Sequence, residues 1–449
     1  MRQSKVVEPR PTVVHGPAPK RGASISAERY ISSDWLADEL ANLFPSAWLF
    51  ACLEADVADA GDYHVLNIGA ESVLVCRASD GSLGAFYNVC QHRGARLVPN
   101  QAGFVSRFVC PYHGWTYADD GELVHVPDME RFANGVDCQA KSLRPVRAAT
   151  WNGLVWVCMD EAAPPLLEYL GEVAELATPY NLAGMEVVAD QTVTLACNWK
   201  AVFDNFGELY HVDHIHPQHE LMFNCPQAQL HLFAEGHTSV VIDGHTVNPR
   251  FDIPDTPNRY LAHQLTTFGG DPDNYQGRVL EIRDDIQSLR RAAGPSLGWD
   301  YDAFSDERLS DIEQYNVFPN TMITVQPDDA LIARARPHAS DPNRCYWDML
   351  TLHRYPDPEV AANAGVSYAP KDARGAPPED RPQHEEFTQE DIIAGNKSMG
   401  ATIDQDVHLI RDVQAGMHSR GFHAQTLNSD EARVQHFHDW LNHKLGVTG

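Results

Sequence analysis

Two short stretches of this chain each bring a cysteine and a histidine together. Cys90 is followed by His92, and Cys110 is followed by His113, with glycine or proline beside each pair, which favours tight loops. Two thiolates and two imidazoles can hold a 2Fe-2S cluster, with the cysteines on one iron and the histidines on the other. A zinc site can use the same four side chains, but zinc fingers favour a cysteine pair followed by a histidine pair. The two mixed pairs therefore favour an iron-sulfur centre.

A second group of chemically active side chains follows about a hundred residues later. On a helix, Asp204, Glu208, His211 and Ile215 are spaced i, i+4, i+7 and i+11, so they would share one face. Two carboxylates and an imidazole are an unusual choice for a face that must only pack. We therefore expect a helix whose polar face is directed toward a metal.

Four histidines stand close together here, and their spacing alone does not choose between them. An i+3 spacing favours His211 with His214, and His219 is a further candidate. A pair of His211 and His216 requires the helix to bend or end first. Pro217 makes an end plausible at that point, because the residue before a proline avoids the helical region.

A third ligand is expected to be a carboxylate, since two histidines and one acid on one face of an octahedron leave three positions for oxygen and substrate. The segment Ile403 to Met417 predicts a helix whose apolar stripe contains one acid, Asp406. A buried carboxylate without a cation is costly. Asp406 is thus the first candidate, Asp404 is the second, and Asp412 lies off the stripe.

Both stretches resemble those of the Rieske non-haem iron oxygenases, in the catalytic (alpha) subunit of the aromatic-ring-hydroxylating oxygenases. The first resembles their Rieske motif, including Arg93 after the first histidine. Respiratory Rieske proteins carry two additional cysteines that form a disulfide. Ala95 and Tyr112 stand near those positions here, so the chain is similar to the oxygenase and ferredoxin branch. The resemblance covers nearly all of the chain from about residue 40.

The resemblance also implies the ligands of a mononuclear Fe(II). In the family, a helix containing asparagine presents an acid, then Tyr-His, and then a second histidine five residues later. This pattern selects His211 and His216, leaves His214 as a surface or outer residue, and supports Asp406 through the segment that begins at Gln405. Glu208 matches the acid that links the two metal centres in the family. Most ring dioxygenases have aspartate there, whereas some quaternary-ammonium oxygenases have glutamate.

The function implied is that of a terminal oxygenase. The 2Fe-2S cluster would pass single electrons to the Fe(II), which would activate O2 and hydroxylate a small aromatic or other hydrophobic organic substrate as a monooxygenase or dioxygenase. Oxidative N- or O-demethylation, including that of quaternary ammonium compounds, uses the same residues and is the alternative. If His113 and Glu208 meet between subunits as in the family, a homotrimer is expected, with or without a small β subunit.

Composition excludes some partners. The chain has 449 residues with 34 Lys and Arg against 62 Asp and Glu, a net charge of −28. This charge argues against nucleic acid and anionic membranes as partners. We found no run of about 18 apolar residues and no Gly-x-Gly-x-x-Gly nucleotide motif. Electrons are therefore expected from a separate NAD(P)H-dependent reductase, with or without a ferredoxin.

The other cysteines have no disulfide-framework spacing, which favours buried thiols in the reducing cytoplasm; they are Cys52, Cys76, Cys138, Cys158, Cys197, Cys225 and Cys345. Two other classes of function were weighed against an oxygenase. A simple electron carrier does not need the long second domain, and a zinc-stabilised binding protein would be colourless, whereas a Rieske protein is red-brown.

The fold expected from these patterns is α+β, with a flexible N-terminal arm and lead-in helix over 1–40, a Rieske domain over 41–165 and a catalytic domain over 166–449. Short strands with hairpin turns at Asp80-Gly81 and Asp120-Gly121 predict a small antiparallel sandwich for the Rieske domain. Trp115 and Tyr117 could cover the cluster or fill its core.

The catalytic domain is expected to be the family's helix-grip fold, in which a curved antiparallel sheet surrounds the iron. Strands are predicted over 191–197, 321–325, 330–335 and 346–353, with a hairpin turn at Asp243-Gly244. Residues 355–386 predict an exposed, mobile insertion. The tail from 430 to 445 predicts an amphipathic helix with His436 and His438 on the surface.

Overall fold

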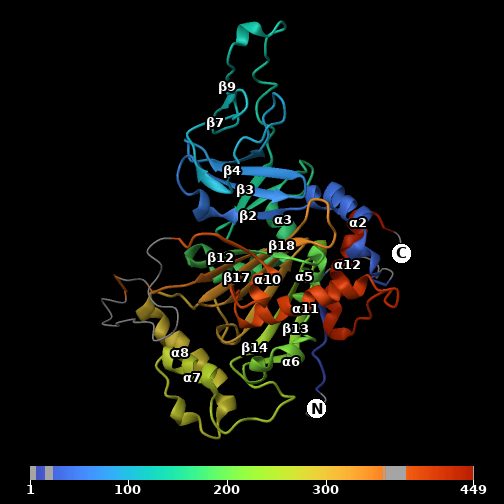
Figure 1. The fold of residues 1–449 in the computed structure, drawn as a ribbon. Helices are drawn as coiled ribbons and strands as arrows, with labels where there is room; N and C mark the ends of the chain where they lie inside the picture. Colours follow the sequence, from blue (N-terminus) through green and yellow to red (C-terminus); the bar gives the residue numbers. More distant parts are fainter. Residues whose placement is uncertain (1–6, 16–23, 357–358, 361–380, 448–449) are drawn as a thin grey trace. The chain divides into compact units, whose positions relative to one another are not determined.

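The computed structural model describes residues 7–15, 24–356, 359–360 and 381–447 (Figure 1). The chain forms two compact units. One holds residues 33–174 and 337–341, and the other holds the described residues of 1–32, 175–336 and 342–449. The predicted α+β class with antiparallel sheets is confirmed. Within the described residues, no helix is long and apolar enough to cross a membrane.

The smaller unit begins with the predicted lead-in helix, α2 (Ser33–Asp38), which continues as a π-helical turn over Glu39–Leu43. Its strands form three antiparallel sheets: β10 (Arg147–Trp151), β11 (Leu154–Cys158) and β2 (Leu49–Leu53); β5 (Leu83–Tyr87), β4 (Glu71–Arg77), β3 (Asp62–Ile68) and β6 (Ala102–Phe104); and β7 (Phe108–Val109), β8 (Thr116–Tyr117) and β9 (Leu123–His125). Both predicted hairpin turns are present, because Gly81 and Gly121 take positive φ angles between paired strands. Helix α3 (Leu166–Leu170) follows β11.

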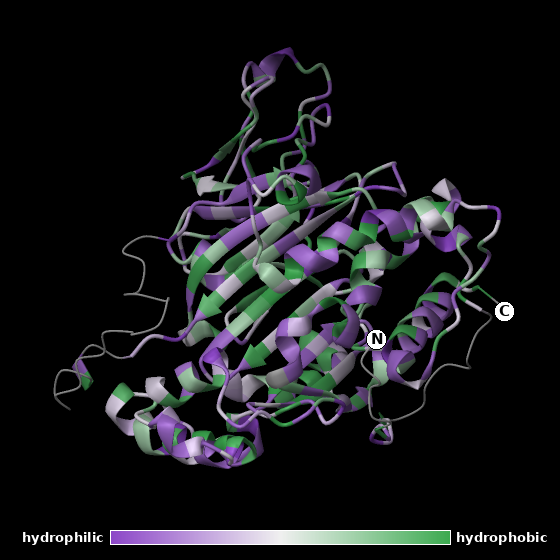
Figure 2. Ribbon diagram, turned by 60° about the horizontal axis from the view of Figure 1, so that its bottom comes forward, coloured by the Kyte–Doolittle hydropathy of each residue, from purple (hydrophilic) through white to green (hydrophobic). Residues whose placement is uncertain are grey.

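The larger unit is built on one nine-stranded sheet. Its strands lie in this order: β1 (Val13–Val14), β13 (Phe223–Leu232), β14 (Thr238–Gly244), β15 (Ile312–Val317), β16 (Thr321–Gln326), β17 (Asp329–Pro337), β18 (Cys345–His353), β12 (Glu186–Leu195) and β19 (Glu385–Thr388). Successive strands from β13 to β17 pair antiparallel, and so do β12 and β18, whereas β1 pairs parallel with β13 and β19 pairs parallel with β12. Buried and more exposed residues alternate along β13, and Figure 2 shows bands of green and purple along the strands.

Helices accompany this sheet, and α10 and α11 lie across one of its faces in Figure 1. Their bounds are α1 (Glu28–Ile31), α4 (Glu172–Ala177), α5 (Trp199–Asn205), α6 (Val212–Ile215), α7 (Arg259–Thr267), α8 (Ile282–Leu297), α10 (Gln389–Ile393), α11 (Ala401–Met417) and α12 (Ala432–Leu445). The predicted late helix from Ile403 to Met417 is confirmed as α11. Asp404 sits at its N-terminal end and accepts hydrogen bonds from the Ser398 hydroxyl (2.6 Å) and the Met399 N–H (2.9 Å).

Several expectations for this unit need correction. The hairpin after β13 turns at Ala234–Gly236, where Glu235 and Gly236 have positive φ angles, and Asp243-Gly244 instead ends β14. Val13–Val14, within the expected flexible arm, forms strand β1. Most of the expected insertion at 355–386 lies outside the described residues, but Glu385 and Glu386 begin strand β19, which pairs with β12.

The helix predicted for the tail is present as α12, but the prediction that its histidines lie on the surface is wrong. His436 and His438 are buried, at 4% and 1% exposure. His436 Nε2 is 2.7 Å from the carbonyl oxygen of Phe233, and His438 Nε2 is 2.9 Å from the Tyr30 hydroxyl. Neither partner is near in the sequence, so the pattern of the helix alone could not reveal this burial.

Candidate metal centres and substrate pocket

The two Cys-His loops of the smaller unit have the same backbone conformation. In each loop the cysteine N–H donates to the carbonyl five residues later, at 2.8 Å for both Cys90 and Cys110. The glycine four residues after the cysteine, Gly94 or Gly114, donates back to the cysteine carbonyl at 3.0 Å. Both glycines have positive φ angles, 75° and 71°, which a side chain would strain. The short motifs therefore set the loop geometry locally.

The four side chains lie together, with the cysteines inside and the histidines near the surface. Cys90 and Cys110 are 1% and 2% exposed, whereas His92 and His113 are half-buried, with ring centroids 4.6 Å apart. The Nδ1 atom of His92 is buried and has no hydrogen-bond partner in the part of the chain that the structure describes, as expected for an atom that a metal would satisfy. This donor set fits a 2Fe-2S cluster with a buried, sulfur-held iron and an outer, nitrogen-held iron.

Two aromatic residues cover this group, and both also belong to the core of the unit. Trp115 stacks flat on His92, with centroids 4.7 Å apart and planes 5° apart. The Tyr117 hydroxyl lies 3.3 Å from Cys90 Sγ and accepts the Gln91 N–H at 3.0 Å. Burial raises the pKa of Tyr117, so the hydroxyl keeps its proton. Trp115 and Tyr117 therefore both cover the proposed cluster site and fill the core of the unit.

In the larger unit, the stretch from Asp204 to Ile215 is not the continuous helix that the spacing predicted. Helix α5 ends at Asn205, turns follow, and α6 begins only at Val212. The Glu208 carboxylate accepts the backbone N–H groups of Tyr210 and His211, the latter at 3.1 Å. A side chain that binds nearby N–H groups competes with helical hydrogen bonding, which explains the break.

The break separates Asp204 from the histidines. Asp204 Oδ2 accepts a hydrogen bond from the buried Tyr30 hydroxyl, and Oδ1 lies 3.1 Å from His438 Nε2. Burial, and next the charge of Asp204, raises the pKa of Tyr30. Asp204 is therefore part of a buried polar network between α1, α5 and α12.

The structure brings His211, His216 and Asp406 together. Their ligand atoms all lie within 4.8 Å of one another. Asp406 Oδ1 is 3.6 Å from His211 Nε2 and 3.3 Å from His216 Nε2. Helix α6 ends at Ile215, so His216 leaves the helix (φ −117°, ψ 66°), as Pro217 suggested. Asp406 is 5% exposed and comes from the stripe of α11 that the sequence indicated.

Outer hydrogen bonds orient both histidines. His211 Nδ1 is bonded to Glu208 Oε1, and His216 Nδ1 lies 2.7 Å from Gln405 Oε1. Because both acceptors lack a proton to donate, each Nδ1 carries the hydrogen and each Nε2 keeps its lone pair for a metal. Burial opposes protonation of His216, but its bonds with Asp406 and Gln405 hold its pKa above the ordinary value. Two histidines and one carboxylate fit non-haem Fe(II).

The remaining candidates lie outside this trio. His214 is exposed, in agreement with the surface role inferred for it. Asp404 accepts the Ser398 hydroxyl and the Met399 N–H just before α11, as described above. His219 Nε2 is 3.1 Å from the Thr402 hydroxyl, and burial lowers the pKa of His219 to about 4. Sequence reasoning did not identify Gln405 as an orienting residue, although it directly precedes the predicted ligand.

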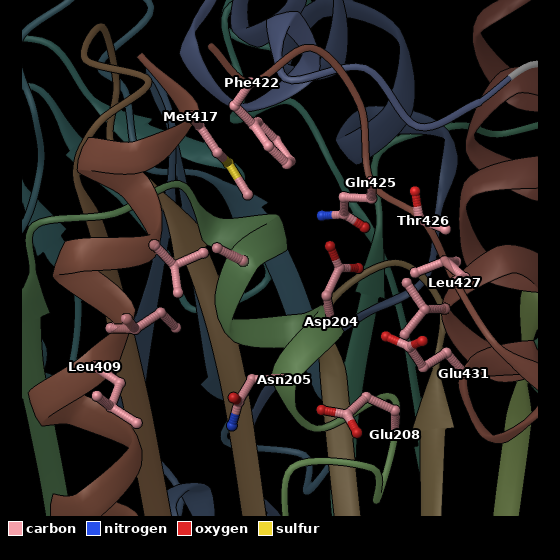
Figure 3. Close-up of a pocket in the computed structure, with 14 residues that line it drawn as sticks. Asp204, Asn205, Glu208, Leu409, Met417, Phe422, Gln425, Thr426, Leu427 and Glu431 are labelled. Atoms are coloured by element: carbon pink, nitrogen blue, oxygen red, sulfur yellow. The ribbon is translucent and has the colours of Figure 1, made fainter. Parts of the chain in front are cut away.

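Glu208 lines two pockets. On one side, a pocket of about 380 Å³ is lined by Asp204, Glu208 and Glu431, which Figure 3 labels. Burial raises the pKa of Glu431. The hydrogen bond from the Asn428 backbone opposes this shift, and the charge of Glu208 adds to it. On the other side, a pocket of about 290 Å³ contains His211, His216 and Asp406. Glu208 thus stands between an acidic outer pocket and the trio.

The pocket at the trio is mostly apolar. One side is formed by the trio and its neighbours on α11, and the other by strands of the large sheet. Its apolar lining includes Phe206, Leu209, Phe223, Ile242, Ile312 and Leu331. Among the described residues that line it, Glu208 and Asp406 are the carboxylates. This composition suits a small hydrophobic molecule held beside a metal.

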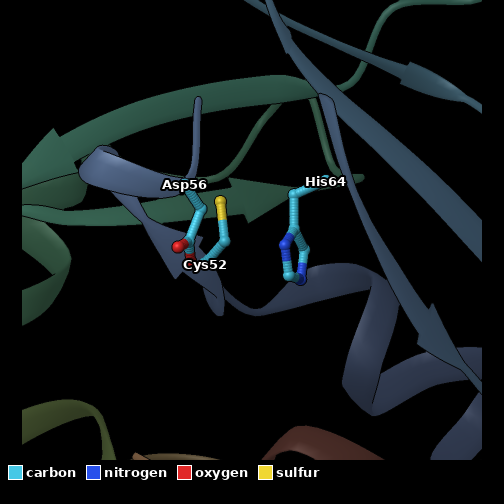
Figure 4. A group of neighbouring side chains, drawn as sticks. All are labelled: Cys52, Asp56 and His64. Carbon is cyan, nitrogen blue, oxygen red and sulfur yellow. The ribbon is translucent and has the colours of Figure 1, made fainter. Parts of the chain in front are cut away.

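A second trio of ligand-type residues, Cys52, Asp56 and His64, lies in the smaller unit (Figure 4). Its ligand atoms are also within 4.8 Å of one another. Asp56 Oδ2 accepts the Leu53 N–H at 3.0 Å and so closes the turn after β2. The Asp56 carboxylate therefore has a structural role in the fold of this unit.

Comparison with known proteins agrees with both centres. Residues 47–144 match the Rieske [2Fe-2S] domain, and residues 182–446 match the catalytic domain of the ring hydroxylating alpha subunit. The chain belongs to the ring-hydroxylating alpha-subunit family, in which a Rieske 2Fe-2S domain accompanies a non-haem iron catalytic domain.

Similar proteins act on chemically different substrates. The chain is 37% identical over 193 residues to the large oxygenase component of the 2,4-dinitrotoluene dioxygenase system of Burkholderia sp. (strain RASC), covering 42% of this chain and 43% of that protein. It is 38% identical over 184 residues to that of the naphthalene 1,2-dioxygenase system of Pseudomonas putida, covering 40% and 41%. It is 33% identical over 180 residues to the glycine betaine monooxygenase oxygenase subunit of Pseudomonas aeruginosa, covering 40% and 42%. The aligned part thus spans about two-fifths of these relatives.

Solved structures show the same fold over almost the whole chain. A naphthalene 1,2-dioxygenase variant bound to phenanthrene has a TM-score of 0.66 at 20% identity, covering 96% of this chain and 95% of that chain. The quaternary ammonium Rieske monooxygenase CntA with L-carnitine has a TM-score of 0.64 at 18% identity, covering 94% and 95%.

Proposed function

We propose that this chain is the terminal oxygenase component of a multicomponent system, using O2 to hydroxylate a small, hydrophobic organic substrate. The observation that carries this proposal is the trio of His211, His216 and Asp406 at an apolar pocket, in a chain that also contains a Rieske domain. Bound there, Fe(II) would supply the activation of O2 by electrons from the 2Fe-2S cluster.

The protein's own residues hold and orient the reaction partners. The two Nε2 atoms and the Asp406 carboxylate would hold the metal, and three protein ligands leave it able to take oxygen. Glu208 and Gln405 fix the direction of each imidazole ring. The apolar walls bind the substrate and exclude water from the reacting atoms.

Glu208 also provides the route for electrons. Its carboxylate contacts His211 and lines the acidic outer pocket, so a histidine entering that pocket could donate to it. His113 of a second copy, in a head-to-tail ring, is the partner that we propose. A ring of three would give every subunit one complete site. A separate NAD(P)H-dependent reductase, with or without a ferredoxin, would supply the electrons.

The pocket favours a neutral substrate over a quaternary ammonium ion. Of the two acids among the described lining residues, Asp406 belongs to the trio and Glu208 is bonded to His211, and most of the lining is aliphatic or aromatic. A buried cation needs an opposing charge or several aromatic faces. Among the described residues, two phenylalanines, Phe206 and Phe223, line it, with no tyrosine or tryptophan. Oxidative demethylation stays the second candidate, because Glu208 occupies the position where some quaternary-ammonium oxygenases have glutamate.

The test is a substrate screen with reconstituted enzyme and a surrogate reductase. Naphthalene, toluene and 2,4-dinitrotoluene represent the first class, and glycine betaine and carnitine the second. We expect oxygenated products from neutral aromatics, with incorporation of oxygen from 18O2. Formaldehyde released from glycine betaine, with no aromatic product, would instead establish the demethylase.

A further inference from the structure

The sheet wall of the trio's pocket contains one pair of polar side chains. Gln314 on β15 and Thr324 on β16 are directly opposite each other in the strand register, and both line the pocket. Gln314 Nε2 lies 3.4 Å from Thr324 Oγ1. The other sheet residues around them include Ile242, Ile312 and Leu331. Polar groups in such a wall are costly unless they gain a partner.

A buried arginine fixes the direction of the Gln314 amide. Arg433 from α12 is 1% exposed, and its Nη2 donates to Gln314 Oε1 at 2.9 Å. Its Nε donates to the Thr238 hydroxyl at 3.1 Å. Burial lowers the pKa of Arg433 to about 9, so it stays protonated at neutral pH. Because an arginine can only donate, the amide oxygen must face Arg433 and the NH2 group must face the pocket.

The amide NH2 group therefore has a hydrogen to offer. One N–H is directed to Thr324 at the long distance of 3.4 Å. The other N–H has no acceptor among the described residues. The Thr324 hydroxyl accepts this weak bond and keeps its own hydrogen available. The pocket thus presents two donors on its sheet side, opposite the side formed by the trio.

From this geometry we infer that Gln314 and Thr324 form a specificity subsite that binds a hydrogen-bond acceptor on the substrate. A nitro, carbonyl or ether oxygen, or a ring nitrogen, would satisfy the donors. The apolar remainder of the molecule would then extend toward the trio, so that the carbon to be oxidised lies away from the acceptor group. This inference rests on the proposed function and specifies its substrate class.

Binding of isosteric ring systems tests the subsite without turnover. Naphthalene, quinoline and isoquinoline have nearly the same shape, but the last two carry a ring nitrogen at different positions. Dissociation constants would be measured by calorimetry on the iron-loaded enzyme without reductase. One matched hydrogen bond is worth roughly a factor of five. We expect the better of the two nitrogen heterocycles to bind about fivefold more tightly than naphthalene.

Three variants separate the subsite from general pocket effects. Gln314→Glu keeps the size and the contact with Arg433 but replaces the donor with an acceptor, so the preference should disappear or reverse. Thr324→Val removes the hydroxyl at equal size and should halve the preference. Leu331→Val, which is opposite Thr324 in the register, should weaken all three ligands equally and keep their ratio.

The outcomes for the subsite and for the oxygenase are distinguishable. Equal binding of the three ligands by the wild type, or an unchanged ratio in both Gln314→Glu and Thr324→Val, overturns the subsite, even if naphthalene is oxygenated. A preference that depends on Gln314, with no oxygenated product from any ligand, supports the subsite and contradicts the oxygenase.

Discussion

The two candidate metal sites of this chain are constructed in different ways. The Cys-His loops complete their own backbone hydrogen bonds within a few residues, and all four ligands lie in one stretch from Cys90 to His113. The trio joins two histidines around α6 to Asp406 on α11, which is far away in the sequence. Local chemistry sets the first site, whereas the second depends on the tertiary fold.

This difference predicts that each site can be lost without the other. The largest expected effect comes from His211→Ala, which removes a proposed iron ligand and the contact with Glu208. Product formation should fall below detection while the red-brown absorbance of the cluster persists. Loss of the colour in this variant would show that the two sites are not independent.

The reciprocal change is Cys110→Ser. It removes a proposed ligand of the cluster, as His211→Ala removes a proposed ligand of the mononuclear iron. The visible absorbance should disappear, because serine does not replace the thiolate. Fe(II) bound at the trio, measured by titration under anaerobic conditions, should be retained. Retention of the wild-type spectrum would contradict the role of Cys110.

Glu208 is the residue by which the two sites would communicate. Glu208→Gln keeps the size of the side chain and an acceptor for His211, but it removes the negative charge. Both metals should stay bound, and electron delivery to the trio should slow by about 10- to 100-fold, the range found for outer-sphere partners. Rapid-mixing measurement of cluster oxidation checks this value, and an unchanged rate excludes the proposed route.

A smaller effect is expected from the other orienting residue. Gln405→Leu removes the acceptor of His216 Nδ1 and should weaken Fe(II) binding by about tenfold. Gln218→Leu is the control, because Gln218 Nε2 donates to Gln405 Oε1 at 2.8 Å and, among the described residues, makes no hydrogen bond to the trio. Equal weakening by both variants would mean that Gln405 acts through general packing.

The smallest effect concerns acid stability of the larger unit. Burial lowers the pKa of His245 to about 3, and its Nδ1 lies 2.9 Å from the Ser310 carbonyl oxygen. The unfolded chain therefore binds the proton more readily, and stability is lost as the pH falls from about 6.5 toward 3. At pH 5 this difference in pKa should lower the free energy of unfolding by about 2 kcal/mol. His245→Asn should show a weaker dependence on pH in denaturant titrations; identical slopes would contradict this assignment.

The sequence predicted the local features well. The cluster loops, both small hairpins, the lead-in helix and strands β16 to β18 follow from motifs, turn residues and alternation. Asp406 could be chosen because it is the acid within an apolar stripe. These signals are contained in neighbouring residues, so no knowledge of the rest of the fold was needed.

One local feature was missed: the helix expected through Asp204 and His211 is interrupted, because Glu208 accepts the N–H groups of residues two and three positions later. The other missed features depend on partners that are distant in the sequence. His438 is buried by Tyr30, a partner from the N-terminal part of the chain. Gln314, on strand β15, acquires its direction from Arg433 on helix α12. Spacing along the chain carries no information about such contacts.

Metal and acid-labile sulfide analysis of the purified, reconstituted protein tests the central claim most directly. Two separate centres predict about three iron atoms and two sulfides per chain, and about two of each in His211→Ala. Zinc in place of the iron and sulfide, or the same iron content in both proteins, would contradict the account.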